Sequence, residues 1–276
     1  MILSGTTAVA GIMGWPIGHS RSPRLHGYWL REYGVDGVYL PLVASPEGIE
    51  AAFRGLPGLG FRGVNVTIPH KLSALAACDH IDDVAARIGA VNTIIIGEDG
   101  ALSGTNTDAF GFLANLRQES DWRGVEGPAV VLGAGGAARA VCVALLDAGV
   151  PEVRIANRTD SRAQALADEF GLTAFPWADR AAALDGAALV VNATSLGMTG
   201  QPTLDLLLDA LPIDALVHDI VYAPLETELL TQARARGNPI VDGLGMLLHQ
   251  ARPGFEAWFG VSPDVTPALR NFVLES

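Results

Sequence analysis

Hydrophobic residues recur along this chain at two spacings, and the segments that carry them alternate. Short apolar runs predict strands at residues 8–13, 38–43 and 64–66, with helices in the two gaps, at 23–33 and 46–56. Strands and helices in alternation are typical of a mostly parallel sheet whose faces are covered by helices. The pattern therefore predicts an α/β fold.

Turn and cap signals complete the first part of the chain. Ser22 offers a capping hydroxyl to the first helix, and Pro23 suits its first helical position. The run Glu98-Asp99-Gly100 predicts a hairpin turn between two short strands. Helices are predicted at residues 82–88 and 108–119, and we expect a domain boundary near the second of these.

A second alternating series begins at residue 129. Strands are predicted at residues 129–132, 153–156, 173–175, 189–192, 216–219 and 240–242. Helices are predicted at 137–148, 161–170 and 226–236, with weaker ones in the other gaps. Six strands with interleaved helices are typical of a Rossmann-type, doubly wound nucleotide-binding domain.

Two helices follow this series, at residues 244–258 and from 267 to the end. They have no later strand to pair with, so we expect them to pack on the first domain. The predicted organisation is an N-terminal α/β domain of residues 1–107, completed by residues 244–276, and a Rossmann-type domain of residues 108–243.

Composition narrows the possible partners. The chain of 276 residues is 49% hydrophobic and 17% charged, and its net charge is −12. No basic block exists, so nucleic acid is excluded as a partner. No apolar run approaches the ~18 residues of a membrane helix, and no basic region precedes the apolar stretch near the N-terminus. Cys78 and Cys142 suit reduced core residues, which indicates a cytoplasmic protein.

A glycine-rich loop follows the first strand of the second series. Gly133, Gly135 and Ala138 fit the pattern G-x-G-x-x-G/A between a strand and a helix. Gly133 allows a tight turn, Gly135 lets the backbone approach a pyrophosphate, and the helix N-terminus faces the phosphates. A structural turn is the alternative, but the surrounding βαβ unit favours a dinucleotide site.

The end of the next strand indicates which dinucleotide is bound. A protein that binds NAD usually places Asp or Glu there, on the ribose 2′-hydroxyl. Here Asn157 and Arg158 occupy the position, and Arg162 follows one helical turn later. Two guanidinium groups can clamp a 2′-phosphate, so we expect NADP(H) as the cofactor. Asp160 has the opposite charge but lies past the strand end, and incidental arginines at a solvated helix start are the alternative.

Polar side chains follow the strand at residues 64–66. Pro69 ends strand pairing, so we expect Asn65, Thr67 and Lys71 at one corner, where an amide, a hydroxyl and an amine can hold and protonate a polyhydroxylated molecule. A lone lysine after a strand is more often a solvated surface residue. The sharper hypothesis pairs Lys71 with Asp108, although a carboxylate that opens a helix also suits a cap.

Two serines precede the first helix. The hydroxyls of Ser20 and Ser22, with the helix dipole, can hold a carboxylate, while capping is the structural alternative. The six histidines are scattered, so no metal site is predicted. Ser195 lies in a loop after a strand without a nucleophile-elbow motif, so we expect it in a wall of the cofactor site.

With these pieces in order, the chain resembles the shikimate dehydrogenase family over its whole length. The resemblance rests on nine segments in the same order. They are residues 14–23 (GWPIGHSRSP), 65–71 (NVTIPHK), 89–93 (GAVNT), 106–108 (NTD), 133–138 (GAGGAA), 157–159 (NRT), 192–195 (NATS), 219–224 (DIVYAP) and 242–247 (DGLGML).

The resemblance implies a role for each matching residue. Lys71 and Asp108 would be the catalytic pair. The substrate carboxylate would be bound by Ser20, Ser22 and Tyr222, and the ring hydroxyls by Thr67, Asn92, Gln250 and the catalytic pair. The residues implied for NADP(H) are Gly133, Ala134, Gly135, Gly136 and Ala137 at the pyrophosphate, Asn157, Arg158, Thr159 and Arg162 at the phosphorylated ribose, and Ile220, Gly243 and Met246 at the nicotinamide.

The implied activity is the reversible, NADPH-dependent reduction of 3-dehydroshikimate to shikimate, a step toward chorismate and the aromatic amino acids. Three alternatives stay open from the sequence: a broader quinate/shikimate dehydrogenase that uses NAD or NADP, an aminoshikimate-type homologue, and a non-catalytic NADP sensor. The sensor would have no need for Lys71 with Asp108 and the serine pair. We expect a monomer or a homodimer, with a small-molecule substrate and no membrane partner.

Overall fold

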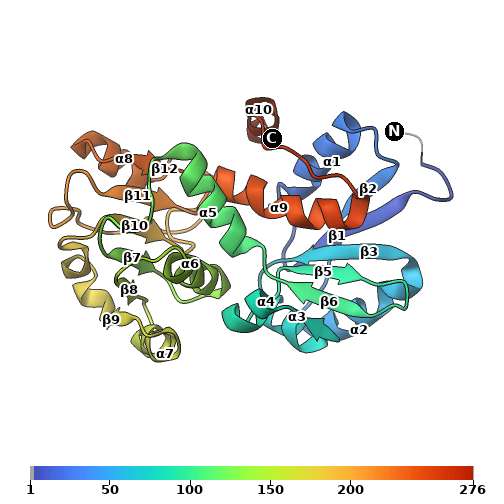
Figure 1. Cartoon of the computed structure of the whole chain (residues 1–276), viewed down its shortest axis with the longest axis horizontal. Helices are drawn as coiled ribbons and strands as arrows, with labels where there is room; N and C mark the ends of the chain where they lie inside the picture. The colour runs from blue at the N-terminus through green and yellow to red at the C-terminus, as the bar shows by residue number, and fades with distance from the viewer. Residues whose placement is uncertain (1–2, 276) are drawn as a thin grey trace. The chain divides into compact units, whose positions relative to one another are not determined.

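The computed structural model describes residues 3–275, and its chain forms two compact units. Unit 1 comprises Met1–Thr107 and Leu247–Ser276, and unit 2 comprises Asp108–Met246. The blue-to-green and dark red parts of the ribbon in Figure 1 belong to unit 1, and the green-to-orange part between them belongs to unit 2.

Unit 1 is built on a six-stranded sheet with the order β2-β1-β3-β5-β6-β4. Three strand pairs are parallel, and the pairs β3–β5 and β5–β6 are antiparallel. The strands are β1 (Ala8–Gly14), β2 (Gly37–Val43), β3 (Phe61–Val66), β4 (His80–Ile81), β5 (Thr93–Ile96) and β6 (Leu102–Thr105). The helices are α1 (Ser22–Glu32), α2 (Ile49–Gly55), α3 (Lys71–Ala77), α4 (Asp83–Ile88), the 3₁₀ turn η1 (Pro57–Leu59), most of α9 (Leu244–Phe259) and α10 (Pro267–Leu274).

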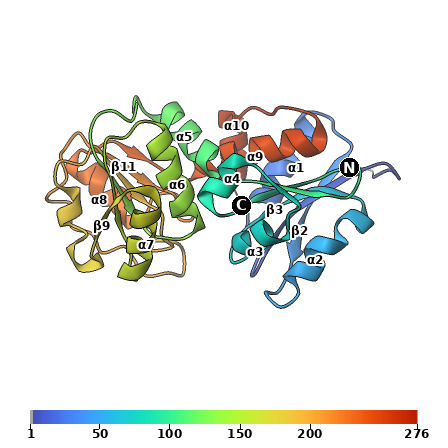
Figure 2. The same ribbon diagram turned by 60° about the horizontal axis from the view of Figure 1, so that its bottom comes forward.

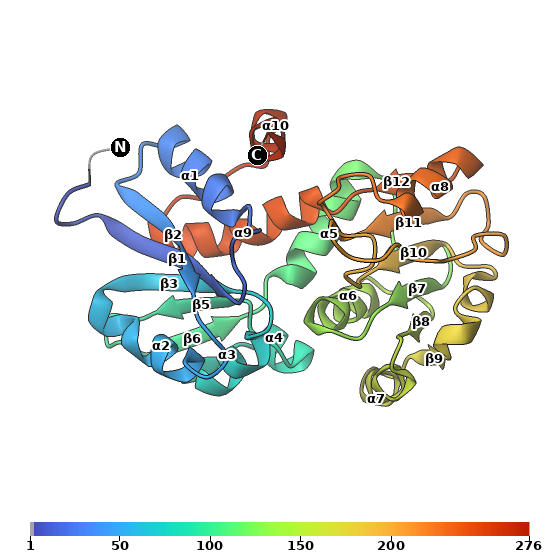
Figure 3. The same cartoon turned by 180° about the vertical axis from the view of Figure 1, so that it is seen from behind.

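The two faces of this sheet carry different helices. Helices α2, α3 and α4 cover one face, where Phe53, Val64, Ala74 and Ile94 belong to one buried apolar cluster. Helices α1, α9 and α10 lie on the other face, as Figure 1, Figure 2 and Figure 3 show from three directions. The side chains of β3 alternate between the faces, so Asn65 points away from the cluster that holds Val64.

Local chemistry explains where the structure and the sequence prediction differ in unit 1. Ser22 makes no side-chain cap: it is already the first helical residue, and Arg21 holds the cap position. The prediction missed α3 and β4, because Pro69 signalled only a strand end and β4 has two residues. Both C-terminal helices, residues 244–276, were expected to complete the N-terminal domain; residues 247–276 belong to unit 1, and residues 244–246 at the start of α9 belong to unit 2.

Unit 2 contains a six-stranded, fully parallel sheet with the order β12-β11-β10-β7-β8-β9. This order is that of a doubly wound dinucleotide-binding fold, whose direction reverses between β7 and β10. The strands are β7 (Ala129–Leu132), β8 (Val153–Ala156), β9 (Thr173–Phe175), β10 (Leu189–Asn192), β11 (Leu216–Asp219) and β12 (Ile240–Val241). The helices and 3₁₀ turns are α5 (Asp108–Glu119), α6 (Gly136–Asp147), α7 (Asp160–Phe170), η2 (Trp177–Asp179), η3 (Ala182–Leu184) and α8 (Glu228–Arg236).

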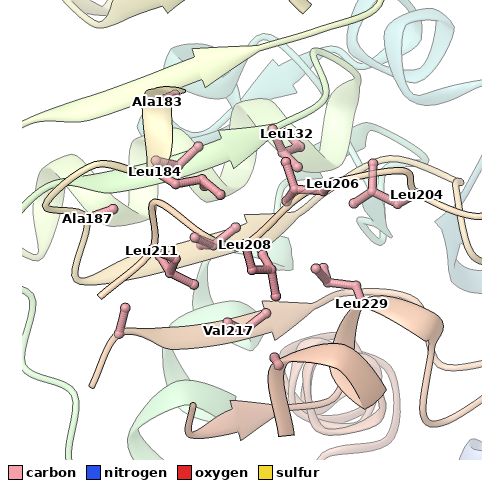
Figure 4. Close-up of a cluster of buried hydrophobic side chains, with 14 of the residues drawn as sticks. Leu132, Ala183, Leu184, Ala187, Leu204, Leu206, Leu208, Leu211, Val217 and Leu229 are labelled. Carbon is pink, nitrogen blue, oxygen red and sulfur yellow. The ribbon is translucent and has the colours of Figure 1, made fainter. Parts of the chain in front are cut away.

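The weaker helices expected in the remaining gaps of unit 2 are absent from the described residues between β10 and β11. An extended segment there buries Leu204, Leu206 and Leu208, while Leu207 is 67% exposed. Figure 4 shows these leucines with Leu184, Leu211 and Leu229 in one apolar cluster. Burial of every second residue is the period of a strand, so the segment covers the sheet without coiling into a helix.

Candidate active site

The corner that carries Thr67 and Lys71 is formed where β1 and β3 end side by side in unit 1. The Thr67 amide donates to the Met13 carbonyl at 2.9 Å, and the Trp15 amide donates to the Ile68 carbonyl at 3.1 Å. A Cβ atom on Gly14 would lie 2.6 Å from Cγ2 of Thr67, so only glycine allows this approach. The sequence Gly14-Trp-Pro therefore shapes the position of Thr67.

Lys71 is the first residue of α3, and its position is set by its neighbours. The buried His70 ring makes a 2.8 Å hydrogen bond to the Ala44 carbonyl, and the Val91 amide donates to the Lys71 carbonyl at 3.1 Å. A cation in the first turn opposes the helix dipole by about 0.3–1 kcal/mol, so this position does not stabilise the helix. Lys71 is also the only lysine in the chain.

Asn92 and Gln250 are brought together through Thr107, although 158 positions separate them in sequence (250 − 92). Oδ1 of Asn92 accepts from the Thr107 amide at 2.9 Å and from Oγ1 of Thr93 at 2.9 Å. Oγ1 of Thr107 lies 3.5 Å from Oε1 of Gln250. Nδ2 of Asn92 donates to Oγ1 of Thr107 at 3.1 Å, so hydrogen bonds fix the Asn92 amide at both its oxygen and its nitrogen.

The serine pair lies at the start of α1. The Ser22 amide donates to Oγ of Ser20 at 3.3 Å, so the Ser20 hydroxyl accepts there and keeps its own proton for another acceptor. Ser22 is 3% exposed and Ser20 is partly exposed. We define the polar site of unit 1 as Ser20, Ser22, Thr67, Lys71, Asn92 and Gln250.

Asn65 does not take the place expected for it at the surface corner. Its side chain is 4% exposed, and it accepts from the Tyr39 hydroxyl at 2.6 Å and donates to Oγ1 of Thr93 at 3.0 Å. Its partners Tyr39 and Thr93 lie on β2 and β5, 26 and 28 positions away in sequence. Sequence reasoning missed Tyr39, Thr93 and Thr107, since no local pattern marks such long-range bonds.

The glycine loop of unit 2 lies between β7 and α6. Gly133 has φ +114°, and a Cβ atom there would lie 2.8 Å from the Ala193 carbonyl oxygen after β10. A Cβ atom on Gly135 would meet nothing within 4 Å, so this glycine leaves open space in front of the backbone. Among the described residues no side chain caps the twelve-residue helix α6 that follows, and Ala138 in its first turn is fully buried.

Exposed arginines follow β8, the strand next to β7. Arg158 and Arg162 are both exposed, and within the described residues neither guanidinium group has a hydrogen bond or ion pair. Asn157 donates to the Thr159 carbonyl at 2.9 Å and shapes the turn. Oδ1 of Asp160 accepts from the Trp177 amide at 2.9 Å, so this carboxylate serves the fold. We define the glycine-loop site of unit 2 as residues 133–137 with Asn157, Arg158, Thr159 and Arg162.

A buried carboxylate organises the loop after β11. Asp219 accepts from Nδ2 of Asn192 at 3.0 Å, from the Val221 amide at 3.0 Å and from Oγ1 of Thr227 at 2.7 Å. Burial raises its pKa, and these hydrogen bonds oppose the rise. The three bonds hold the loop that carries Ile220 and Tyr222.

Ile220, Gly243 and Met246 belong to the same unit, and the first two are in contact. A Cβ atom on Gly243 would collide with the Ile220 carbonyl group, so this position requires glycine. Gly245 likewise leaves room for Asn115, whose Nδ2 donates to the Asp242 carbonyl at 2.9 Å. Met246 is 7% exposed in the first turns of α9.

Ser195 is exposed in the loop after β10, and its side chain has no nucleophile-activating partner among the described hydrogen bonds.

Residues 133–138 and the two arginines fit a 2′-phosphorylated dinucleotide. Open space before Gly135, uncapped amides at the start of α6 and two exposed guanidinium groups supply donors for phosphate oxygens. Among residues 3–275, no group of His, Cys, Asp and Glu could hold a metal ion, and no helix could span a membrane.

The two sites define a class: a two-domain oxidoreductase that uses a nicotinamide dinucleotide on a small polar substrate. Family models match three stretches: the shikimate dehydrogenase substrate binding domain at residues 12–94, shikimate/quinate 5-dehydrogenase at 121–198, and the shikimate 5′-dehydrogenase C-terminal domain at 243–270. A relative from Paramagnetospirillum magneticum, named shikimate dehydrogenase (NADP(+)), is 60% identical over 99% of this chain and 100% of its own length. The chain belongs to the shikimate dehydrogenase family.

Solved structures agree with this assignment. The shikimate 5-dehydrogenase of Thermus thermophilus, in complex with NADP(H) and shikimate, is 40% identical, with a TM-score of 0.86 over 97% of this chain and 98% of that one. A quinate dehydrogenase of Corynebacterium glutamicum in complex with NAD is 33% identical, with a TM-score of 0.90 over 98% and 99%. The predicted family and fold class are confirmed.

Proposed function

We infer that this protein is an NADP-dependent shikimate dehydrogenase, which reversibly reduces 3-dehydroshikimate to shikimate. The observation that carries this inference is the 60% identity, over nearly all of both chains, to a shikimate dehydrogenase (NADP(+)). The reaction is a step of the shikimate pathway, which leads to chorismate and the aromatic amino acids. A cytoplasmic location and a monomeric or homodimeric state stay predictions.

We propose that the glycine-loop site of unit 2 binds NADP(H). The amides of residues 133–137 would hold the pyrophosphate, and Asn157, Arg158, Thr159 and Arg162 the phosphorylated ribose. Ile220, Gly243 and Met246 would line the nicotinamide pocket, the first two through their backbone. The exposed, unpaired arginines and the absence of a strand-end acid at β8 support this assignment. Bound NADPH supplies the hydride that adds to the C3 carbonyl of the substrate.

We propose that the polar site of unit 1 binds the substrate. The hydroxyls of Ser20 and Ser22, with Tyr222, would donate to its carboxylate. Thr67, Asn92 and Gln250 would bind the ring hydroxyls together with Lys71 and Asp108. The two bonds accepted by Oδ1 of Asn92 fix the orientation of its amide, which supports a role in substrate recognition.

Lys71 and Asp108 would carry the proton transfer. In reduction, the Lys71 ammonium donates a proton to the oxygen that becomes negative as the carbonyl is reduced, and in oxidation the neutral amine accepts it. Asp108 is 6% exposed at the start of α5, where a helix N-terminus stabilises its negative charge. Its carboxylate would orient the reacting hydroxyl and the lysine.

The test is a comparison of four substrate pairs with purified protein. Shikimate and quinate are each offered with NADP⁺ and NAD⁺, and the absorbance of the reduced nicotinamide is followed. We expect kcat/KM for shikimate with NADP⁺ to exceed every other pair by about tenfold or more, or about 1.4 kcal/mol in the transition state. A comparable rate with quinate or NAD⁺ would show a broad-specificity enzyme, and no rate with any pair would contradict the assignment.

A further inference from the structure

Tyr39 lies behind the polar site of unit 1, in a pocket of aromatic rings. It is on β2, its side chain is 6% exposed, and its ring stacks on His26 with 3.8 Å between centroids and a 3° angle. Trp258 of α9 packs beside it at 6.0 Å. Neither ring nitrogen of the fully buried His26 has a hydrogen-bond partner among residues 3–275, so His26 does not compete for the Tyr39 hydroxyl.

The direction of the Tyr39 hydrogen bond is determined by its neighbours. Nδ2 of Asn65 donates to Oγ1 of Thr93 at 3.0 Å, because the Thr93 hydroxyl uses its own proton on Oδ1 of Asn92 at 2.9 Å. The amide oxygen of Asn65 must then face Tyr39, and the two oxygens are 2.6 Å apart. Since an amide oxygen only accepts, the Tyr39 hydroxyl is the donor.

This chain of bonds continues to residues proposed to bind the substrate ring. Oδ1 of Asn92 receives the Thr93 proton and the Thr107 amide, and Thr107 adjoins Gln250. Every link lies within unit 1. If Asn65 loses its donor and turns its amide, Thr93 loses the bond that directs its proton to Asn92.

Burial also keeps the Tyr39 phenol neutral. It raises the pKa of Tyr39 well above its usual value, against a smaller opposing contribution from the Ser22 hydroxyl. The phenol therefore keeps its single proton, which it donates to Oδ1 of Asn65.

We propose that Tyr39 is a positioning residue of this enzyme: its buried hydroxyl acts through Asn65 and Thr93 to hold the side-chain amide of Asn92 in place. The proposal rests on the substrate role proposed above for Asn92. Tyr39 itself acts through these residues and has no role in the chemical step. A pre-oriented binding group loses less freedom when the substrate binds.

The test is Tyr39→Phe, which keeps the ring between its aromatic neighbours and removes only the hydroxyl. We expect KM for shikimate to rise about tenfold, the loss of about one net hydrogen bond, while kcat changes less than about threefold and KM for NADP⁺ is unchanged. Tyr28→Phe on α1, whose ring packs against Phe272 at an interplanar angle of 49°, is the matched control and should change none of these. A fall in kcat with both KM values unchanged would mean a purely structural role and would overturn the proposal.

A second measurement does not depend on the substrate. In nitrogen-15-labelled protein, the side-chain amide signals of Asn65 and Asn92 should shift in Tyr39→Phe and stay in place in Tyr28→Phe. Unchanged amide signals would overturn the proposal even if shikimate proved not to be the substrate. If Tyr39→Phe folds poorly, Thr93→Val breaks the same chain at its next link, and the same KM increase is expected.

Discussion

The polar site of unit 1 and the glycine-loop site of unit 2 are built by opposite means. In unit 1, buried side chains hold one another in a continuous chain from Tyr39 to Gln250. In unit 2, the site consists of backbone amides and two exposed arginines, and Gly135 in its loop contributes no side chain. The difference matches the two proposed ligands.

This difference in construction shows how specificity for a small polar substrate and specificity for phosphate groups are each obtained. A small molecule with several hydroxyl groups is recognised by the direction of each hydrogen bond, which a buried network can set in advance. Phosphates carry several equivalent oxygens, so charge and helix amides suffice and side-chain directions matter less. Changes in unit 1 should therefore affect catalysis and substrate KM, while changes in unit 2 should affect cofactor KM.

The largest effect is expected at Lys71. Lys71→Ala should lower kcat by about 10²–10⁴-fold with a modest change in substrate KM, since general acid–base help is lost while the rest of the polar site remains. The measurement is steady-state kinetics with shikimate and NADP⁺. A kcat like that of the unchanged enzyme would refute the catalytic role of Lys71. It would also refute the expectation that changes in unit 1 affect catalysis.

The arginine pair should control the choice of cofactor. Arg158→Ala with Arg162→Ala removes two charge-assisted hydrogen bonds, and KM for NADP⁺ should rise about 100-fold while KM for NAD⁺ changes little. Arg117→Ala, which removes an exposed charge from the end of α5, is the control for net charge. An equal rise for both cofactors would show that the arginines act without contacting the 2′-phosphate.

Acid sensitivity should separate the two buried histidines. Burial lowers the pKa of His26 in unit 1 and of His218 in unit 2 to about 3. The folded-state pKa of each histidine lies below the unfolded value of 6.5. Neither histidine therefore lowers the free energy of unfolding above pH 6.5. As pH drops from 6.5 toward 3, each one lowers it by about 1.4 kcal/mol per pH unit. The loss due to His26 amounts to about 2 kcal/mol at pH 5. His26→Phe should remove this loss and leave the free energy of unfolding at pH 7 nearly unchanged.

His218→Phe is the matched comparison. It should reduce the same acid effect, but it also removes the 3.2 Å hydrogen bond between Nδ1 and the Val241 carbonyl, which should cost about 1 kcal/mol at neutral pH. Urea denaturation midpoints at pH 5 and pH 7 measure both variants. Unaltered acid dependence in His26→Phe would show that this histidine is not buried in its neutral form.

The smallest effect is expected in the glycine loop. Gly135→Ala should fold normally, because the residue has φ −91° and its Cβ would meet open space, but the added methyl group should raise KM for NADP⁺ about tenfold. Gly133→Ala should instead lower the thermal midpoint, since φ is +114° and the Ala193 carbonyl is too close. Unchanged NADP⁺ affinity in Gly135→Ala would place the pyrophosphate elsewhere.

Unit 2 was the more predictable part from sequence. Its strands are continuous apolar runs that end at glycine or polar residues, so β7 to β11 begin and end where the pattern placed them. The leucine segment at residues 203–208 was the exception. A weak helix was expected in this gap between two strands, but the segment is extended. A short-range pattern shows that such residues are buried, but not which sheet face they cover.

Unit 1 was less predictable because its site depends on distant pairs. Strand alternation places Asn65 on one face, yet nothing near it identifies Tyr39, which is 26 positions away, as its partner. The same holds for Thr93 and Thr107, whose polar side chains look like ordinary loop residues. The roles of the individual site residues in both units remain predictions for the experiments above.

The single lysine of the chain gives the enzyme an unusual chemical property. Apart from the N-terminus, Lys71 is the only primary amine, so an amine-directed label would report on one proposed catalytic group without further engineering. A lysine-specific protease would likewise have one peptide bond to cut, between Lys71 and Leu72 in the first turn of α3. The rate of that one cut, with and without shikimate, would measure how often this turn opens and whether the substrate holds it closed.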